Sequence, residues 1–276
     1  MKKLTLSLIL ALLSIGCQKT TTVTQSALNT GSGCLIGRWN NSKLPLNLTI
    51  SPEFVDNVDK TNLQQMAAQW NNAVSAQLGK NLIVSNFATS NFASYASTSQ
   101  YDDSEMGIYK SYSWFSNVSS NALAITQFFG TVTTSPGLGS YIDLRHADII
   151  LNYRDFSSDF TMTDEANYDY DVPTVVLHEM GHFLGLCHKN NVSSVMGAYY
   201  INTNRSLYDY DKKIIKDIYV NGVISGLESN KNANALTSPP GTEVRGVIEL
   251  RKDGHCIHTI NGKKVYEHIV KNLKRN

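Results

Sequence analysis

Three histidines and one glutamate lie within one stretch of the chain at a spacing that suits a catalytic metal ion. His178 and His182 are four residues apart, so a helix would place both imidazoles on one face, one turn apart. Glu179 lies one step round the helix and could reach a water on the same ion. His188 would bring a third imidazole from a different direction. Three neutral imidazoles leave one position of a zinc ion open for water, which is the catalytic rather than the structural arrangement.

Gly185 predicts how the chain returns His188 to the ion. It follows His182 by three residues, and glycine tolerates the left-handed backbone that commonly ends a helix. A zinc ion at this point would lower the pKa of its water and polarise a carbonyl group. Glu179 would take the proton of that water and later pass it to a leaving amine. The chemistry that these residues indicate is peptide-bond hydrolysis.

The alternative interpretation of the stretch is a surface helix with scattered histidines. A strongly apolar segment speaks against it, because polar groups are costly to bury without partners. Histidines within a buried helix therefore need a reason to be there. The apolar residues of the segment are Val175, Val176, Leu177, Phe183, Leu184 and Leu186.

The extended pattern H-E-x-x-H-x-x-G-x-x-H, with Met196 eight residues after His188, resembles the metzincin signature. Arg38-Trp39 and Ala147-Asp148-Ile149 make residues 38–221 similar to the matrixin branch, and to its bacterial members in particular. The resemblance implies an α+β catalytic domain: a twisted mixed sheet, an active-site helix, a methionine turn and a closing helix. It implies one catalytic Zn²⁺ on His178, His182 and His188, with Glu179 as general base. Met196 would form the hydrophobic floor of the site.

The same resemblance implies a substrate cleft. Ala122, Leu123 and Ala124 resemble the family's edge strand, whose unpaired backbone groups could bind an extended peptide antiparallel. Tyr199 and Tyr200 would help to wall a side-chain pocket, and either could stabilise the oxyanion; simple packing is the alternative role. The chain departs from the family where Gly197-Ala198-Tyr199 replaces the usual proline after the methionine.

Further metal sites are less strongly indicated. Only His146 precedes the active-site helix, so the second, structural zinc of vertebrate matrixins is expected to be missing. Acidic residues from Asp164 to Asp171 are candidates for Ca²⁺, although acidic loops are usually just solvated. His255, Cys256 and His258 are candidates for a metal site, and a polar hairpin with incidental histidines is the favoured interpretation.

Hydrophobic periodicity predicts the elements around the site. Leu44 to Ile50 alternates as a strand does, and Thr61 to Leu78 reads as a helix with a Thr61–Gln64 capping box. The helix of the site should begin near Pro173. Further strands are expected at 82–84, 107–114, 122–129 and 146–153, a closing helix at 210–220, and short strands at 244–250, 255–260 and 265–269.

The first residues are expected to direct export. Residues 1–17 resemble a lipoprotein-type signal peptide that ends at Cys17, the residue to be lipidated; an ordinary secretory signal is the alternative. Residues 18–34 read as a flexible linker. Residues 35–222 would form the catalytic domain, and residues 223–276 a linker with a small appendage, a candidate β-hairpin. We expect an outer-membrane, cell-surface or secreted protein.

The remaining cysteines leave several pairings open. If Cys17 is lipidated, the odd number left, three, means that at least one thiol is free or pairs between molecules. Cys34 could bridge Cys187 or Cys256, or could ligate the zinc and keep an enzyme latent.

Together these features predict an exported zinc endopeptidase that acts on proteins or peptides; extracellular matrix, a protein of a competing bacterium and a self-protein are the open alternatives for its substrate. A net charge of +1 over 276 residues gives no indication of a nucleic-acid partner, and we expect a monomer. One alternative is a narrower peptidase that trims a single partner. Another is a cell-surface binding lipoprotein that keeps the zinc fold without significant turnover.

Overall fold

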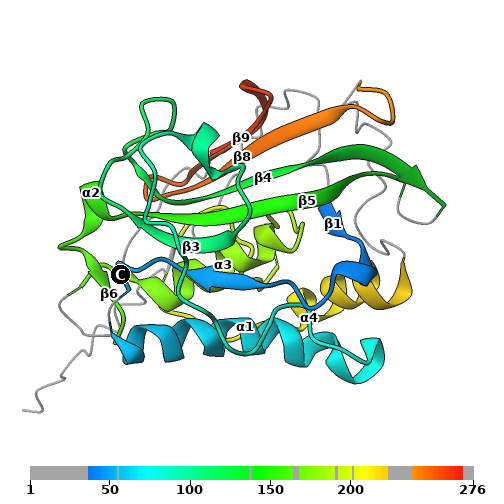
Figure 1. The fold of residues 1–276 in the computed structure, drawn as a ribbon, viewed down its shortest axis with the longest axis horizontal. Helices are drawn as coiled ribbons and strands as arrows, with labels where there is room; N and C mark the ends of the chain where they lie inside the picture. The colour runs from blue at the N-terminus through cyan, green and yellow to red at the C-terminus, as the bar shows by residue number, and fades with distance from the viewer. Residues whose placement is uncertain are drawn as a thin grey trace, which may run out of the picture.

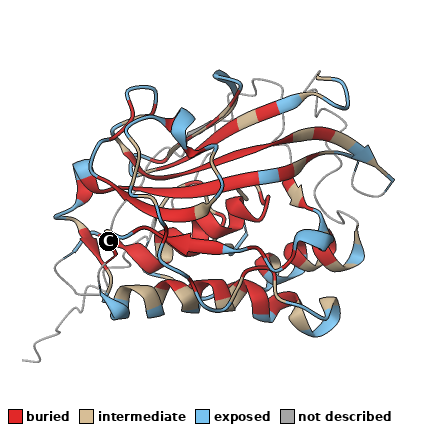
Figure 2. Cartoon of the chain, in the orientation of Figure 1, coloured by how far each residue is buried: buried red, intermediate tan, exposed pale blue. Residues whose placement is uncertain are grey.

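The protein is described from a computed structural model, which covers residues 37–54, 56–136, 139–163, 168–189, 192–200, 202–222 and 238–269. A large twisted sheet lies over a layer of helices, with α1 and α3 beneath it (Figure 1). Buried residues concentrate on the facing sides of the two layers (Figure 2). This confirms the predicted α+β class.

The main sheet has the strand order β10-β9-β8-β4-β5-β3-β2, and β1 pairs with β5 beside β3. Parallel pairs join β5 to β1 and β3, and β3 to β2, whereas β4 is antiparallel to both of its neighbours. The mixed sheet of the prediction is therefore present. The strands are β1 (Gly37–Trp39), β2 (Leu48–Ile50), β3 (Met106–Ser111), β4 (Ala122–Ser135), β5 (Gly139–Asn152), β8 (Glu243–Arg251), β9 (His255–Ile260) and β10 (Lys263–Ile269); β6 (Phe160–Thr161) pairs with β7 (Tyr170–Asp171) separately.

Helix α1 (Asn57–Leu78) begins four residues before the predicted start. Asp56 caps it by accepting a hydrogen bond from the backbone N–H of Val58 (2.8 Å), and Gly79 ends it in the left-handed conformation. The predicted Thr61–Gln64 capping box is wrong, because the Thr61 hydroxyl donates to the Asn57 carbonyl inside the helix. The side chains that α1 buries are Leu63, Met66, Ala67, Trp70, Asn71, Ala73 and Val74.

Helix α3 (Val172–Phe183) lies between α1 and the sheet. Helix α4 (Asp209–Lys216) follows it in the chain and continues into a wider turn, Asp217–Asn221. Both α4 and this turn pack against α1. The short elements are η1 (Asn41–Lys43), η2 (Thr98–Tyr101) and α2 (Tyr153–Phe156). Within the described residues, no helix has the length and hydrophobicity needed to span a bilayer.

The C-terminal strands extend the main sheet instead of standing apart from it. β8 pairs antiparallel with β4 from Ala122 to Thr131, and β9 and β10 follow β8 outward. The expectation that Ala122, Leu123 and Ala124 form an exposed sheet edge is therefore wrong. Their strand has a neighbour on each side, and all three residues are fully buried.

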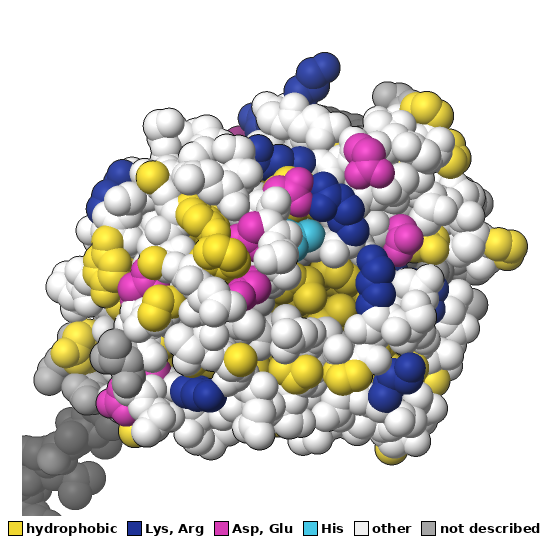
Figure 3. Space-filling view, in the orientation of Figure 1, with side chains coloured by type: hydrophobic (Ala, Val, Ile, Leu, Met, Phe, Trp, Pro, Cys, Tyr) yellow, Lys and Arg dark blue, Asp and Glu magenta, His cyan; other side chains and the backbone are white. Residues whose placement is uncertain are grey.

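Charged side chains are interspersed on the face drawn in Figure 3. Lys and Arg alternate there with Asp and Glu, with hydrophobic side chains between them. Charged side chains of the protein also form ion pairs, such as Arg145 with Asp102 (2.7 Å). This face has no large surface of a single charge.

Candidate metal centre

Helix α3 starts from a well-satisfied N-terminus. The Asp171 carboxylate accepts from the Thr174 backbone N–H (2.9 Å) and from its hydroxyl (2.6 Å). Pro173 occupies the first turn, where its missing N–H costs nothing. Arg205 forms an ion pair with the same carboxylate. Asp171 thus serves the helix. Of the other acidic calcium candidates between Asp164 and Asp171, Asp164 and Glu165 lie outside the described residues.

The three histidines converge on one point. The Nε2 atoms of His178 and His182 are 3.0 Å apart, and the Nε2 of His188 lies 3.0 Å from the first and 2.9 Å from the second. His178 and His182 project from successive turns of α3, and His188 returns to them after the helix has ended. The sequence prediction brought together the same three residues.

The other ring nitrogens are held by the protein. His178 Nδ1 lies 2.7 Å from the Val195 carbonyl oxygen, and His182 Nδ1 lies 2.8 Å from that of Leu186. A carbonyl can only accept, so each Nδ1 carries the proton and each Nε2 lone pair faces the other histidines. This is the second-shell arrangement that orients metal-ligating histidines.

Burial favours the form of the histidines that binds a metal. It lowers the pKa of His178 to about 4 and that of His182 well below its ordinary value. Both rings are therefore neutral near pH 7. Three converging imidazole nitrogens suit Zn²⁺, which takes nitrogen ligands in catalytic sites with one position left for water.

Glu179 lies beside the cluster, held by the adjacent strand. Thr126 of β4 donates its hydroxyl to Glu179 Oε2 (2.5 Å). The second oxygen, Oε1, is buried and has no hydrogen-bond partner among the described residues. Burial raises the pKa of Glu179 to about 8, and the Thr126 hydrogen bond opposes this rise. A buried carboxylate oxygen without a partner is costly, so it fits a site that receives a further polar group.

The chain leaves α3 at Gly185, as predicted. Gly185 has φ +92°, and a Cβ there would lie 2.0 Å from the Gly37 carbonyl oxygen of β1. The Gly37 N–H donates to the Gly185 carbonyl (2.9 Å). Only glycine suits both the left-handed backbone and the close approach of β1.

Two aromatic side chains satisfy the carbonyl groups at the end of α3. The Trp39 indole N–H donates to the Phe183 carbonyl (2.7 Å), and the Tyr219 hydroxyl donates to the Leu184 carbonyl (2.8 Å). The Trp39 backbone N–H in turn donates to the Tyr219 hydroxyl (3.2 Å). The start and the end of the described catalytic region thus meet at this helix terminus.

Met196 packs beneath the cluster. A Cβ placed on Gly181, between the two helical histidines, would lie 2.2 Å from Met196 Sδ. The turn that carries Met196 is held by Asp211 of α4, which accepts from the Ser194 hydroxyl (2.5 Å) and the Val195 N–H (3.0 Å). Sequence reasoning missed this role of Asp211, which supports Val195, the residue that orients His178.

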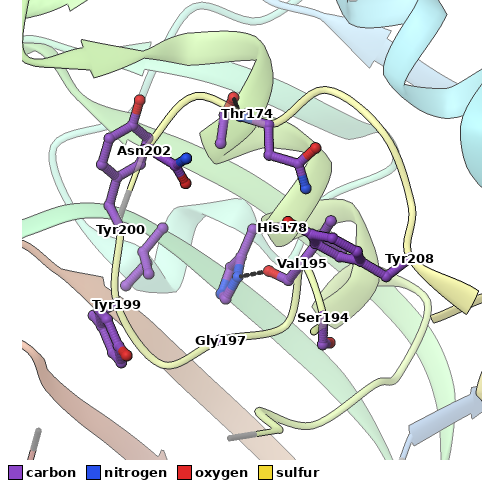
Figure 4. A pocket seen from close by; sticks show the side chains of 11 residues that line it. Thr174, His178, Ser194, Val195, Gly197, Tyr199, Tyr200, Asn202 and Tyr208 are labelled. Atoms are coloured by element: carbon purple, nitrogen blue, oxygen red, sulfur yellow. Dashed lines mark hydrogen bonds between the residues drawn. The ribbon is translucent and has the colours of Figure 1, made fainter. Parts of the chain in front are cut away.

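Tyr199 and Tyr200 border a cavity beside His178 (Figure 4). The Tyr200 hydroxyl accepts from the Asp171 N–H (3.0 Å), and its ring packs edge-on against Tyr170. This favours packing as the role of Tyr200. Tyr199 lines the cavity and forms a parallel bridge with Arg251 at the end of β8.

The C-terminal strands contribute residues that the sequence interpretation set aside. Cys256 Sγ lies 2.7 Å from His188 Nδ1, and His258 Nε2 lies 3.1 Å from the same atom. Both residues are buried, so the interpretation of a polar hairpin with incidental histidines is wrong for them. It holds for His255, which pairs with Glu267 on the opposite face (2.7 Å). The two-residue spacing of Cys256 and His258, which puts both on one face of a strand, was the available signal.

The described cysteines differ in state. Cys187 is disulfide-bonded, whereas Cys256 is a free thiol. A Cys34–Cys256 bridge, one of the predicted pairings, is therefore excluded. Cys17 and Cys34 themselves lie outside the described residues, as do the predicted signal peptide and linker at residues 1–34.

Comparison with known proteins agrees with this geometry. No curated protein matches the chain. Residues 139–220 match the model of the matrixin family of peptidases. The matched part runs from β5 through α3 and the methionine turn to the end of the helical region. The chain therefore carries a matrixin-like metzincin domain, the domain of a zinc metalloprotease family.

Proposed function

We propose that the protein is an exported zinc-dependent endopeptidase in which Glu179 is the general base. The observation that carries the proposal is the convergence of three imidazole Nε2 atoms within 3.0 Å of one another, next to a buried carboxylate. His178, His182 and His188 would hold the ion. When bound, zinc supplies a Lewis acid that polarises the scissile carbonyl and lowers the pKa of water.

The protein's own groups then perform the proton transfers. Glu179 takes a proton from the attacking water and delivers it to the leaving nitrogen. Thr126 fixes one carboxylate oxygen, so that the other, Oε1, is the one available for the transfer. The Val195 and Leu186 carbonyls keep the His178 and His182 rings oriented throughout.

Substrate binding follows from the position of β4. An extended peptide that took the place of β8 and paired antiparallel with β4 would run past Glu179, because Thr126 of β4 contacts the Glu179 carboxylate. Backbone pairing makes few demands on sequence, and the cavity lined by His178, Tyr199 and Tyr200 would select a side chain.

The test of this function is zinc stoichiometry measured together with hydrolysis of a quenched casein substrate. We expect one zinc per chain and cleavage that a chelator abolishes and added zinc restores. Zinc binding without any cleavage, in the full chain and in the variant opened as described below, would contradict the proposal. Cleavage that is insensitive to chelators would also contradict it.

Export and anchoring rest on the sequence of residues 1–17. We propose that Cys17 is lipidated and tethers the protein to a membrane surface. A single acyl chain binds a membrane reversibly, and further acyl chains make such an anchor stable. Labelled fatty acid should be incorporated into the wild-type chain and lost in Cys17→Ser. Equal labelling of both chains would rule this anchor out.

A further inference from the structure

Strand β8 lies where the proposed function requires a substrate. It pairs antiparallel with β4, from Ala122↔Arg251 to Thr131↔Glu243. On its other side, Arg251 forms a parallel bridge with Tyr199, from the segment that walls the side-chain cavity. β8 therefore lies between β4 and, at its end, the segment that contains Tyr199. An extended peptide bound in the cleft would have the same two neighbours.

Two side chains of β8 flank the histidine cluster. Leu250 lines the cavity that contains His178 and Tyr199. Ile248, two residues earlier and thus on the same face of the strand, lines a second cavity that contains His182. Ile248 is also the register partner of Thr126, the residue that holds Glu179. The strand thus crosses the cluster with one aliphatic side chain on each side.

This arrangement closes the site. Glu179 has 0% of its surface exposed, His182 2% and His178 4%. An extended substrate cannot pair with β4 beside the carboxylate while β8 stays in place, because the backbone of β4 is already paired there and Ile248 and Leu250 already line the neighbouring cavities.

Strand β9 adds a contact with the third histidine. Cys256 and His258 reach His188 Nδ1, the nitrogen on the far side of the ring from the cluster. For His178 and His182, the corresponding nitrogen is held by backbone near α3. Only His188 depends, in the described contacts, on the C-terminal strands for this support.

The bonding of β8 is incomplete. Glu249 Oε2 and Arg251 Nε are buried without hydrogen-bond partners among the described residues, and the ion pair between them is long, at 3.8 Å. Displacing β8 would return both atoms to water, which offsets part of the cost of exposing its apolar side chains.

We propose that β8, β9 and β10 form a built-in inhibitor that occupies the cleft in place of substrate and is displaced on activation. The C-terminal segment as a whole is here called the cover (residues 243–269). The inference rests on the proposed function, since it concerns access to the same site. The proposal explains why Glu179 is held in position by Thr126, as a catalytic base should be, and is nevertheless completely buried.

Gly246 offers a way to open the cover without touching the proposed ligands or base. It lies opposite Phe128, and a Cβ on it would be 1.9 Å from the Phe128 ring. Gly246→Val should therefore push β8 off β4. Thr259→Val is the matched control, because it adds a valine to the same strands on the face of β9 opposite Cys256 and His258.

A reversible lock tests the same idea in the other direction. Thr131 and Glu243 are Cα partners at the far end of the β4–β8 pair, with a hydrogen bond between their side chains (2.6 Å). Antiparallel partners lie within the Cα separation that a disulfide spans. The double variant Thr131→Cys/Glu243→Cys should fix the cover when oxidised and release it when reduced.

The experiment measures three quantities on the zinc-loaded full chain: cleavage of a quenched peptide, alkylation of Cys256 followed by peptide mass spectrometry, and binding of a peptide hydroxamate. We expect Gly246→Val to raise all three at least tenfold and Thr259→Val to change none. The oxidised double variant should show no cleavage, and reduction should restore the wild-type rate.

The outcomes separate this inference from the proposed function. Two results would overturn the proposed inhibitor and leave the proposed peptidase intact. One is a wild-type chain that cleaves as fast as Gly246→Val. The other is a locked chain that cleaves as fast when oxidised as when reduced. Faster alkylation and hydroxamate binding without cleavage would support the inhibitor and contradict the peptidase. Should Gly246→Val fail to fold, hydroxamate binding by the locked chain decides: equal binding before and after reduction overturns the inference.

Discussion

Helix α3 and the cover meet at the same histidines but are built in different ways. The three proposed ligands lie within eleven residues, from His178 to His188, and turns of the local chain bring them together. Cys256 and His258 reach His188 from 68 and 70 residues away. Spacing in the sequence therefore reveals the chemistry of this site, whereas access to it depends on strand pairing between distant segments.

The two regions also differ in how they satisfy polar groups. The carbonyls at the end of α3 receive hydrogen bonds from Trp39 and Tyr219, and its N-terminus is capped by Asp171. The cover leaves Glu249 Oε2 and Arg251 Nε without hydrogen-bond partners among the described residues, with an ion pair of 3.8 Å between them. Buried groups are normally paired. Helix α3 also has one buried atom without a hydrogen-bond partner, Oε1 of the proposed base Glu179, so the contrast lies between the capped ends of α3 and strand β8.

The comparison is tested most severely at Glu179. If α3 carries the chemistry and the cover only controls access, Glu179→Gln in the Gly246→Val background should lower cleavage at least about 100-fold. Zinc content and Cys256 alkylation should stay at the values of the opened parent. Glu243→Gln, at an exposed carboxylate, is the control. Residual cleavage equal to that of the parent would remove Glu179 from the mechanism.

Met196 tests how tightly α3 is packed. Met196→Ala leaves a cavity beneath Gly181 and should lower the free energy of unfolding by about 2–5 kcal/mol, measured by urea denaturation of the zinc-loaded chain. Met196→Leu keeps most of the volume and should cost less than about 1.5 kcal/mol. Equal losses from the two substitutions would mean that packing under α3 is not tight.

Gly185 sharpens the comparison by separating backbone strain from close packing. Gly185 and Gly79 both have positive φ, but a Cβ on Gly79 has no atom within 4 Å, whereas one on Gly185 meets Gly37. Gly79→Ala should cost about 1–2 kcal/mol from its left-handed backbone alone. Gly185→Ala should cost clearly more and weaken zinc binding. If urea denaturation gave the same loss of unfolding free energy for both variants, β1 would have to move away from residue 185 without a measurable loss of stability.

Tyr219 gives the smallest effect and the only one that depends on pH. Burial raises the pKa of Tyr219 above its ordinary value. Its contribution to stability is therefore complete below pH 10, near the pKa of an unfolded tyrosine, and is lost as pH rises toward the higher folded value. Tyr219→Phe should cost about 1 kcal/mol at pH 8 and show a shallower loss between pH 9.5 and 11. Parallel pH profiles for both chains would contradict this.

Sequence reasoning succeeded where a local signal was sufficient. The spacing of His178, His182 and Gly185 predicted the helix, its end and the cluster, because each depends on backbone geometry over a few residues. The three C-terminal strands were also predicted close to their observed bounds. The start of α1 was misplaced because Asp56, not Thr61, caps it.

The failures arose where distant segments pair. Nothing in residues 122–124 shows whether their strand is an edge, because that depends on a partner more than one hundred residues later in the chain. For the same reason, Cys256 and His258 looked incidental until β8 placed β9 beside His188. The role of Asp211 was hidden because one buried acid in a helix looks like any other until its partners in the methionine turn are known.

The contact of Trp39 with Tyr219 has a consequence for the order of events in folding. These residues are 180 positions apart in the chain, and both are needed to satisfy the last carbonyls of α3. A chain that emerges N-terminus first cannot complete that helix end until Tyr219 has been synthesised. Closing so long a loop makes this a slow, late step. The metal-binding geometry is therefore completed only after nearly all of the domain has been made.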